Sequence, residues 1–237
     1  MESPLLRWAV VVQARMGSRR LPGKVLKPLC GKPLLGHLLD RLERAFGSEK
    51  IILATTLKKE DDCLVAYAKG RGIRFYRGSE SDLIDRYYRT MREFGLETVI
   101  RVTSDNPLTD TEELKQLLHL HQNRLADYSH NLNEFGSGLP KGAGVEIFSR
   151  KTLETIWKLA VSPHDREHVN DYIHARPGQF KIALHKAPPE KFSPEASLTV
   201  DTPGDFKKME EIFETLQPNG SPVSLEEALS FLRREKG

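Results

Sequence analysis

The chain alternates short apolar runs with longer segments in which apolar residues recur every three or four positions. The short runs are rich in β-branched residues and are bounded by polar residues, which is the pattern of buried strands. They predict strands at 8–12, 51–54, 73–76 and 98–102. The longer segments are typical of amphipathic helices that pack on a sheet. They predict helices at 33–46, 60–69, 81–94 and 111–123.

Strands and helices that alternate in this way predict an α/β fold. Each strand–helix–strand unit joins two parallel strands by a right-handed crossover, so we expect a mostly parallel sheet with helices on both faces. Beyond about residue 125 the alternation loosens. There the pattern predicts strands at 145–148, 180–186 and 196–200 and helices at 149–159, 165–175, 203–215 and 224–235.

Composition narrows the class of protein. Of the 237 residues, 38% are hydrophobic and 29% are charged, as in a soluble globular domain. The apolar stretch near the N-terminus is too short for a signal peptide or a membrane span and is soon followed by Arg15. We therefore expect a cytoplasmic protein that has no membrane partner. Cys30 and Cys63 show no CxxC spacing, so neither a disulfide framework nor a zinc site is indicated.

Positive charge is concentrated near the N-terminus. Residues 1–50 contain ten Lys or Arg against four Asp or Glu, whereas the remainder contains 26 against 29. A basic segment this local suits a phosphate ligand better than a nucleic-acid surface. A nucleic-acid-binding module would also need stacking aromatic residues spread over a basic face, and only 8% of the residues are aromatic. We therefore expect no nucleic-acid partner.

The first candidate site is the loop 13–24, between the first strand and the first helix. Ligands of open α/β sheets bind outside the carboxyl ends of the strands, where backbone N–H groups in a turn of small residues hold phosphate oxygens. Gly17 and Ser18 supply such a turn, and Arg15 and Lys24 add positive charge for a triphosphate. The loop matches neither a Walker A loop nor a dinucleotide fingerprint. The alternative is an exposed basic turn without a ligand.

Two further predicted strands end in an aspartate. Asp105 follows the strand 98–102, and Asp201 follows the strand 196–200. Magnesium is commonly held by one or two carboxylates together with substrate phosphates. Two strand-end carboxylates that face a basic loop therefore predict a magnesium–triphosphate site. Asp205 lies in the first turn of the next helix and is expected to stabilise that helix instead.

Six motifs in order carry a resemblance to a known family. They are QARMGSRRLPGKVLKPLCGKPLL, FYRGSESDLIDRYY, RVTSDNPL, GVEIFSRKTLE, REHVNDYI and LTVDTPGDF. With these motifs the chain resembles the cytidylyltransferase family of spore-coat polysaccharide biosynthesis proteins, which is related to the CMP-ketodeoxyoctonate and CMP-acylneuraminate synthetases. The resemblance extends from about residue 9 to 215, which is most of the chain.

The resemblance implies a nucleotide-diphospho-sugar transferase type of fold, a Rossmann-like three-layer sandwich, with CTP as substrate and Mg²⁺ as cofactor. It implies that the segment 77–79 meets the cytosine and that Asp105 and Asp201 hold the metal. This chain departs from the family pattern in one place, because Arg20 follows Arg19 where relatives usually have a small residue before a single arginine. The resemblance therefore leaves open which of the two arginines faces the phosphates. The residues implied for CTP are Ala14, Arg15, Gly17, Ser18, Arg19, Lys24, Arg77, Gly78, Ser79 and Ser104.

The resemblance also implies an organisation of the chain. We expect one cytidylyltransferase domain over 1–237, with a nucleotide-binding half at about 1–125 and an excursion at about 126–190 for the acceptor and for a homodimer. His168 is a candidate base or hydrogen-bond donor to an acid substrate, although a lone helical histidine is often structural or exposed. The acceptor candidates are Glu146, Arg166, His168 and Asn170.

The expected reaction is transfer of CMP from CTP to a hydroxyl of a sugar acid or similar acid, with release of pyrophosphate, for cell-surface polysaccharide or glycoconjugate precursors. Such transfers depend on positioning and charge, here from the catalytic candidates Arg15, Lys24, Asp105 and Asp201. The alternative enzyme is a metal-dependent glycosyltransferase of similar fold that uses a nucleotide sugar. Such an enzyme typically holds its metal with a DxD-type acid pair, and no DxD pair follows a predicted strand here. The acid pair 61–62 lies at a helix start and is interpreted as a complement to the helix dipole.

Overall fold

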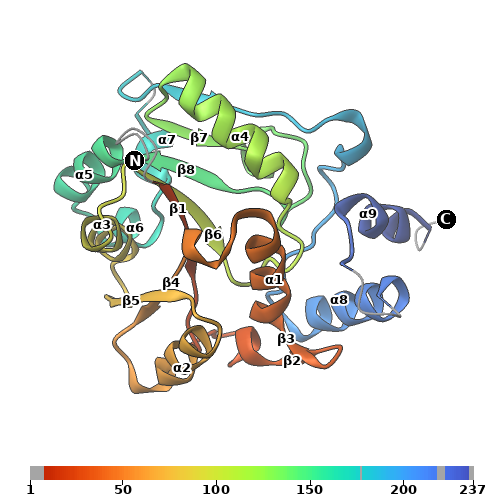
Figure 1. The fold of residues 1–237 in the computed structure, drawn as a ribbon. Helices are drawn as coiled ribbons and strands as arrows, with labels where there is room; N and C mark the ends of the chain where they lie inside the picture. The colour runs from red at the N-terminus through yellow and green to blue at the C-terminus, as the bar shows by residue number, and fades with distance from the viewer. Residues whose placement is uncertain (1–7, 177, 218–221, 235–237) are drawn as a thin grey trace.

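The computed structural model describes residues 8–176, 178–217 and 222–234 (Figure 1). Within them a seven-stranded sheet has the order β5-β4-β1-β6-β8-β7-β9. Of these strands β8 alone runs antiparallel to its neighbours, so the sheet is mostly parallel, as predicted. The strands are β1 (Trp8–Gln13), β4 (Ile51–Thr56), β5 (Arg74–Gly78), β6 (Thr98–Thr103), β7 (Tyr128–His130), β8 (Glu146–Ser149) and β9 (Ile182–Leu184).

Helices cover both faces of this sheet, which confirms the predicted α/β sandwich. One face carries α1 (Leu34–Phe46), α2 (Asp62–Gly70) and α4 (Thr111–Arg124). The other face carries α3 (Leu83–Glu93), α5 (Arg150–Leu159) and α7 (Asp171–His174). No helix within the described residues is long and apolar enough to cross a membrane.

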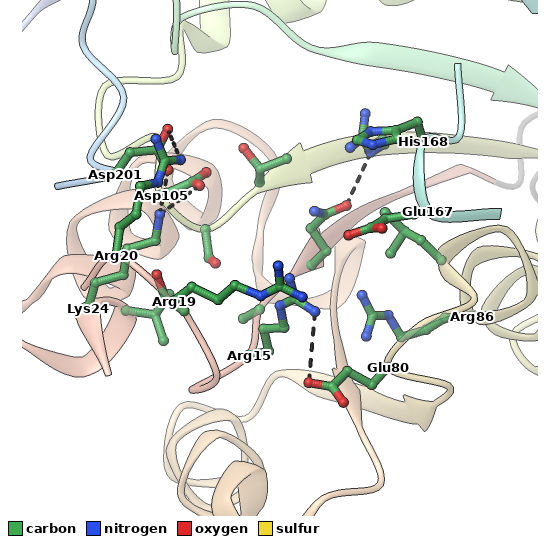
Figure 2. A pocket seen from close by; sticks show the side chains of 18 residues that line it. Arg15, Arg19, Arg20, Lys24, Glu80, Arg86, Asp105, Glu167, His168 and Asp201 are labelled. Atoms are coloured by element: carbon green, nitrogen blue, oxygen red, sulfur yellow. Dashed lines mark hydrogen bonds and ion pairs between the residues drawn. The ribbon is translucent and has the colours of Figure 1, made fainter. Parts of the chain in front are cut away.

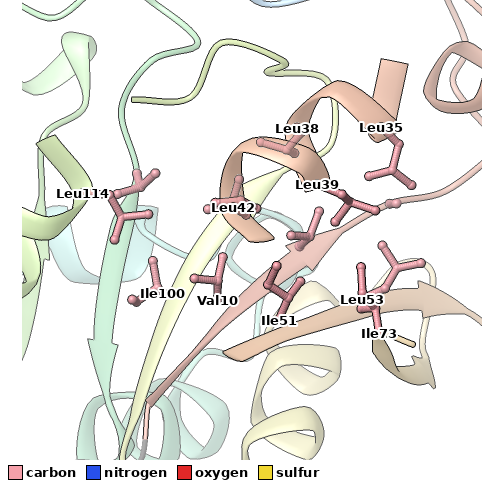
Figure 3. Packing of buried hydrophobic residues seen from close by; sticks show 14 of the residues in the cluster. Val10, Leu35, Leu38, Leu39, Leu42, Ile51, Leu53, Ile73, Ile100 and Leu114 are labelled. Atoms are coloured by element: carbon pink, nitrogen blue, oxygen red, sulfur yellow. The ribbon is translucent and has the colours of Figure 1, made fainter. Parts of the chain in front are cut away.

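The central strand β1 is buried on both sides. Val10 and Val12 belong to the first apolar cluster with α1 and its neighbours, where Leu39 and Leu42 reach down to the sheet (Figure 3). Val11 belongs to the opposite cluster, because successive side chains of a strand point to opposite faces. Since both faces are covered, β1 reads as a continuous apolar run in the sequence.

A third apolar cluster lies beside the carboxyl ends of the parallel strands. It joins α8 (Pro203–Leu216) and α9 (Leu225–Arg234) to the chain segment that precedes α8, including Leu198 and Val200. The backbone N–H of Val200 donates to the carbonyl oxygen of Asp105 at 2.9 Å. This contact brings the residue after Val200 next to the loop that follows β6.

The smaller elements complete the description. A hairpin consists of β2 (Pro28–Leu29) and β3 (Lys32–Pro33), and a short helix α6 (Pro163–Glu167) precedes α7. Single 3₁₀ turns occur at Lys24–Leu26, Ser48–Lys50, Lys59–Asp61, Asn133–Phe135 and Pro189–Lys191.

Two predicted elements differ from the structure, and one strand of the main sheet has no counterpart in the prediction. The segment 196–200 is extended but joins no sheet, apart from one isolated bridge between Lys141 and Ser197. The helix predicted at 165–175 is two short helices, because His168 leaves the helical region with φ −110° and ψ 88°. Strand β7 was not predicted, since three residues with two polar side chains form no apolar run.

Candidate active site

A pocket lies at the carboxyl ends of β1 and β6 and has two ends (Figure 2). We call Lys24, Asp105 and Asp201 the acidic end, and Glu80, Arg86 and Glu167 the arginine end. Figure 2 shows Arg15 and Arg19 between them. The pocket is lined by residues of the β1 loop, the segment before α3, the start of α3, the loop after β6, α6 and the segment before α8.

Lys24 connects the two aspartates at the acidic end. Its Nζ donates to Asp105 Oδ2 at 3.0 Å and to Asp201 Oδ1 at 3.0 Å, and to the carbonyl oxygen of Val200 at 2.6 Å. The lysine is only 7% exposed. Gly23, just before it, has φ 70°, a left-handed conformation that glycine adopts without strain. The local turn therefore aims Lys24 between two segments far apart in sequence.

The cations at the acidic end determine the protonation state of Asp201. Arg20 forms an ion pair with Asp201 Oδ2 at 2.9 Å, so Asp201 accepts from two cations. Burial raises the pKa of the Asp201 carboxyl, but the hydrogen bond and positive charge of Lys24 outweigh burial, and the pKa lies below its ordinary value. Asp201 is therefore a carboxylate at neutral pH.

The acidic end offers the donor set that a hard divalent cation prefers. The two carboxylates converge on one ammonium group, so a cation that replaced this group would have an oxygen of each acid beside it. Among the described residues no three His, Cys, Asp or Glu side chains are grouped to hold a metal. A metal bound to Asp105 and Asp201 would thus complete its coordination with phosphate and water oxygens, which is how magnesium is usually held.

Asp61 anchors the loop that carries the cationic side chains. Its carboxylate is fully buried and accepts the backbone N–H of Met16 at 2.7 Å and the hydroxyl of Thr56. It makes no capping hydrogen bond to α2, so the interpretation as a dipole complement misses its main contact. The loop between Arg15 and Gly17 is therefore fixed from beneath, by a residue 45 positions away.

A second buried network lies behind the pocket. Arg101 pairs with Glu146, which also accepts the Tyr128 hydroxyl at 2.8 Å, and Arg101 Nε donates to Gln13 Oε1 at 3.1 Å. Burial lowers the pKa of Arg101, but the charge of Glu146 outweighs it and raises the pKa. The Gln13 oxygen also accepts the Tyr87 hydroxyl at 2.9 Å. This network fixes the pocket floor.

The structure brings many of the sequence-predicted residues to the pocket. Those that line it are Ala14, Arg15, Ser18, Arg19, Lys24, Ser104, Asp105, His168 and Asp201. Arg20 also lines it but is held by Asp201, whereas Arg19 makes no ion pair among the described residues. Of the two arginines that the sequence left open, Arg19 is thus the one that forms no ion pair with an acid of the described residues.

Other predicted residues lie outside the pocket lining. Arg77 turns away, since its guanidinium binds Asp62 and the carbonyl oxygens of Thr56 and Lys58. Arg166 binds the Trp157 carbonyl oxygen and pairs with Asp82. The predicted residues outside the lining are Gly17, Arg77, Gly78, Ser79, Glu146, Arg166 and Asn170.

Sequence reasoning missed several residues that line the pocket. Glu80 and Arg86 stand inside the motif FYRGSESDLIDRYY, but Arg86 resembles a polar position of an amphipathic helix. Arg101 lies within the apolar strand β6, and a charge in a buried strand was the available signal. Gln13 and Glu167 also stand inside quoted motifs, but nothing in those motifs distinguishes either as a site residue.

Similarity to known proteins indicates the family to which this chain belongs. A sequence model of the family described as cytidylyltransferase matches residues 9–233. The spore coat polysaccharide biosynthesis protein SpsF of Bacillus subtilis is 32% identical over 229 residues, which cover 94% of this chain and 93% of that protein. A 3-deoxy-manno-octulosonate cytidylyltransferase of Anaeromyxobacter dehalogenans is 33% identical over 164 residues, covering 67% and 65% of the two chains.

A solved structure shares the whole architecture. The structure of a cytidylyltransferase from Leptospira borgpetersenii has a TM-score of 0.89 and 28% sequence identity to this chain. The match covers 97% of this chain and 95% of that one. The pocket therefore lies in a fold that this protein shares along nearly its full length.

Proposed function

This chain belongs to the cytidylyltransferase family and is a CTP-dependent nucleotidyltransferase, and we propose that it transfers CMP to a hydroxyl of a sugar acid or a similar acid. Pyrophosphate is the other product. Two kinds of relative support this acceptor class: similar proteins include a 3-deoxy-manno-octulosonate cytidylyltransferase and a spore coat polysaccharide biosynthesis protein. In this proposal the product supplies cell-surface polysaccharide or glycoconjugate synthesis.

The acidic end carries the proposal. Lys24, Asp105 and Asp201 come from three distant segments and meet within hydrogen-bond distance in a pocket that is also lined by exposed arginines. Arg15 is 44% exposed and Arg19 is also open to the pocket. An arrangement of two acids beside several mobile cations is what a metal–triphosphate substrate requires.

Magnesium is the proposed cofactor, held by Asp105 and Asp201. When bound, it would neutralise phosphate charge and polarise the phosphate that is attacked. Lys24 now occupies the position between the two acids, so its ammonium must leave them when a metal binds. A lysine has a flexible stem with a movable point charge, and the nearest new partner for Lys24 would be a phosphate oxygen.

In the proposed reaction several residues of the chain have separate roles. Lys24, Arg15 and Arg19 bind the triphosphate and orient the α-phosphate for in-line attack by the acceptor hydroxyl. The Asp61 contact holds the loop backbone so that these side chains start from a fixed place. His168 follows α6, lines the pocket and is exposed, so it has access to an acceptor as a base or a hydrogen-bond donor.

The proposal also includes the acceptor site, the oligomeric state and the cellular location of the protein. The segment 126–190 is proposed to contribute to the acceptor site and to a homodimer interface, within one cytidylyltransferase domain that works in the cytoplasm. Among the acceptor candidates, Glu146 is engaged by Arg101 and Tyr128, which favours a supporting role behind the pocket. Light scattering at micromolar concentration tests the dimer: a monomer would remove it and leave the CTP reaction intact.

The reaction is tested by screening acids for release of pyrophosphate from CTP in the presence of magnesium. The panel should include 3-deoxy-manno-octulosonate, a nonulosonic acid and non-sugar hydroxy acids. We expect at least one sugar acid to release pyrophosphate and to yield a CMP conjugate by mass spectrometry. Release of a nucleoside diphosphate from a nucleotide sugar, without pyrophosphate from CTP, would instead establish a glycosyltransferase.

A further inference from the structure

The side-chain amide of Gln13 has a fixed orientation at the floor of the pocket. Its Oε1 accepts the Tyr87 hydroxyl at 2.9 Å and Arg101 Nε at 3.1 Å. A guanidinium can only donate, so the Gln13 atom that faces Arg101 must be the carbonyl oxygen. The amide nitrogen of Gln13 therefore points away from Arg101 Nε.

This amide nitrogen is free to bind a ligand. Gln13 is the last residue of β1 and lines the pocket. Its Nε2 donates to no protein group among the described residues, and it does not belong to their buried side-chain nitrogens that lack a partner. Because helices cover both faces of β1, the accessible side of the amide is the side that faces the pocket. Gln13 thus presents an uncharged N–H donor to a ligand.

Arg101 adds a second donor beside Gln13. Its Nη1 pairs with Glu146, and its Nε donates to Gln13. The third nitrogen, Nη2, has no hydrogen-bond partner among the described residues, whereas the side chain is 15% exposed and lines the pocket. Glu146 is only 3% exposed and holds the guanidinium from behind. Both donors are therefore fixed in place before a ligand binds.

The place of this donor pair in the sheet sets it close to the acidic end. Gln13 is paired in parallel register with Thr103, two residues before Asp105. Figure 2 shows His168 across the pocket from Asp105. In the proposed reaction the acceptor must approach the α-phosphate beside the metal that Asp105 holds. The donor pair therefore lies on the floor over which the acceptor would approach.

The chemistry of the pair favours a carboxylate as its ligand. A carboxylate accepts several hydrogen bonds and donates none, so it can accept from both Gln13 Nε2 and Arg101 Nη2. A phosphate carries more negative charge and is better matched by the exposed arginines of the loop 13–24, because Glu146 already balances the charge of Arg101. Outside that loop, Arg86 is the other arginine of the pocket lining, and it is only 4% exposed.

We propose that Gln13 and Arg101 bind the carboxylate of the acid acceptor and make the pocket select an acid over its neutral carboxamide. The proposal rests on the proposed function, in which the triphosphate occupies the acidic end. Gln13 Nε2 donates to one carboxylate oxygen, and Arg101 Nη2 donates to the other. A carboxamide has a single oxygen, and its NH₂ group would meet one of the two donors, so it binds less well.

The test compares kcat/KM for the most active acid of the panel, with 3-deoxy-manno-octulosonate as the first candidate, and for the primary carboxamide of the same acid. Gln13→Glu keeps an acceptor for Tyr87 and Arg101 but replaces the free N–H donor with a carboxylate oxygen. We expect this variant to lower the acid-to-carboxamide ratio about 10-fold or more, because the acid then meets a like charge while the carboxamide NH₂ gains an acceptor. The Kd of CTP with magnesium, measured by calorimetry, should change far less.

Gln116→Glu is the matched control, because it makes the same change at an exposed position of α4 outside the pocket lining and should keep the wild-type ratio. Arg101→Lys keeps a charge opposite Glu146 but loses the second donor, so it should also lower the ratio, and it decides the question if Gln13→Glu does not fold.

An unchanged ratio in the folded variants would overturn the proposal, as would an equal loss for the acid and the carboxamide or a wild-type chain without preference for the acid. These results would leave the reaction with CTP intact. A wild-type chain that releases no pyrophosphate from CTP with any acid of the panel would refute the proposed function as well.

Discussion

The two ends of the pocket balance their charges in different ways. At the acidic end, Lys24 shares Asp105 and Asp201, and Arg20 adds a second cation to Asp201. At the arginine end, Arg86 is buried with no carboxylate partner among the described residues, and its Nε is unpaired. The cations and acids of the first end neutralise one another, whereas the second end keeps a buried guanidinium whose only hydrogen bond among the described residues goes to the Ser79 carbonyl oxygen.

This difference indicates how each end responds to a substrate. A ligand at the acidic end must first displace an existing ion pair, so a metal and a triphosphate are expected to bind there together. At the arginine end the Arg86 guanidinium is already desolvated and already held by the Ser79 carbonyl oxygen, so its position does not require a ligand. The acidic end therefore depends on exchange of partners, while the arginine end depends on preorganisation.

The largest effect is expected when the acids are removed. Asp105→Asn and Asp201→Asn should each lower turnover roughly 100-fold or more, because phosphate charge then lacks its metal. Initial rates of pyrophosphate release over a range of magnesium concentrations measure this loss. Near-normal turnover and magnesium dependence in both variants would disprove the metal site.

Asp205→Ala is the matched control for the acids. Asp205 and Thr202 form a capping box at the start of α8, and the Asp205 carboxylate also accepts the Asp201 N–H at 3.1 Å. We expect this variant to lose about 1 kcal/mol of unfolding free energy, with little change in magnesium dependence. Denaturant unfolding and the same rate assay separate the two effects.

Removing Lys24 should change metal binding in the opposite direction. Lys24→Met leaves the two carboxylates without their cation, so Mn²⁺ alone should bind about 10-fold more tightly than to the wild-type chain, because charges a few Å apart near a surface interact by several kcal/mol. Electron paramagnetic resonance of free Mn²⁺ without nucleotide gives the affinity. Lys27→Met, an exposed lysine over the Phe206 ring, is the control and should leave it unchanged.

A smaller effect is expected beneath the loop. Asp61→Ala leaves the Met16 N–H without its acceptor and should raise the KM for CTP about 5-fold, since an unsatisfied buried group costs about 1 kcal/mol or more. Asp61→Asn keeps one acceptor oxygen and should restore most of the affinity. If both variants unfold at the same temperature but only Asp61→Ala loses CTP affinity, the contact positions the loop; equal KM values would rule this role out.

The smallest effect is expected at Arg77. Its guanidinium is held by Asp62 and two backbone carbonyl oxygens outside the pocket lining, so Arg77→Gln should alter the CTP KM by less than about twofold. Steady-state kinetics with varied CTP checks this. A large rise in KM would show that Arg77 moves into the pocket when CTP binds, as the family resemblance implies.

Much of the fold could be predicted from local pattern. The buried strands β1 and β4 are covered on both faces, and their apolar runs are therefore unbroken in sequence, whereas Arg101 interrupts the run of β6. The extended segment 196–200 has a similar apolar run, but its apolar residues pack on α8 and α9 instead of entering a sheet. Burial alone does not determine which backbone a segment pairs with.

Some residues of the site could likewise be predicted from the sequence, and others could not. Asp105 and Asp201 could be predicted to meet because each follows an apolar segment and precedes a helix. Arg86 and Asp61 could not be assigned, because their roles depend on what lies beneath or beside them in space. In the sequence Asp61 resembles a helix-start acid, and only the structure shows that it accepts the Met16 N–H. Arg86 resembles a polar helix position, and only the structure shows that its buried Nε has no partner among the described residues.

The central claim is that a metal–triphosphate takes the place of the Lys24 ammonium at the acidic end. A crystal structure with CTP and Mn²⁺, with the anomalous signal of the metal, tests it most directly. The account predicts an anomalous peak between the carboxylates of Asp105 and Asp201, with Lys24 Nζ moved onto a phosphate oxygen. A structure in which CTP is bound while Lys24 still bridges both aspartates and the metal lies elsewhere would contradict it.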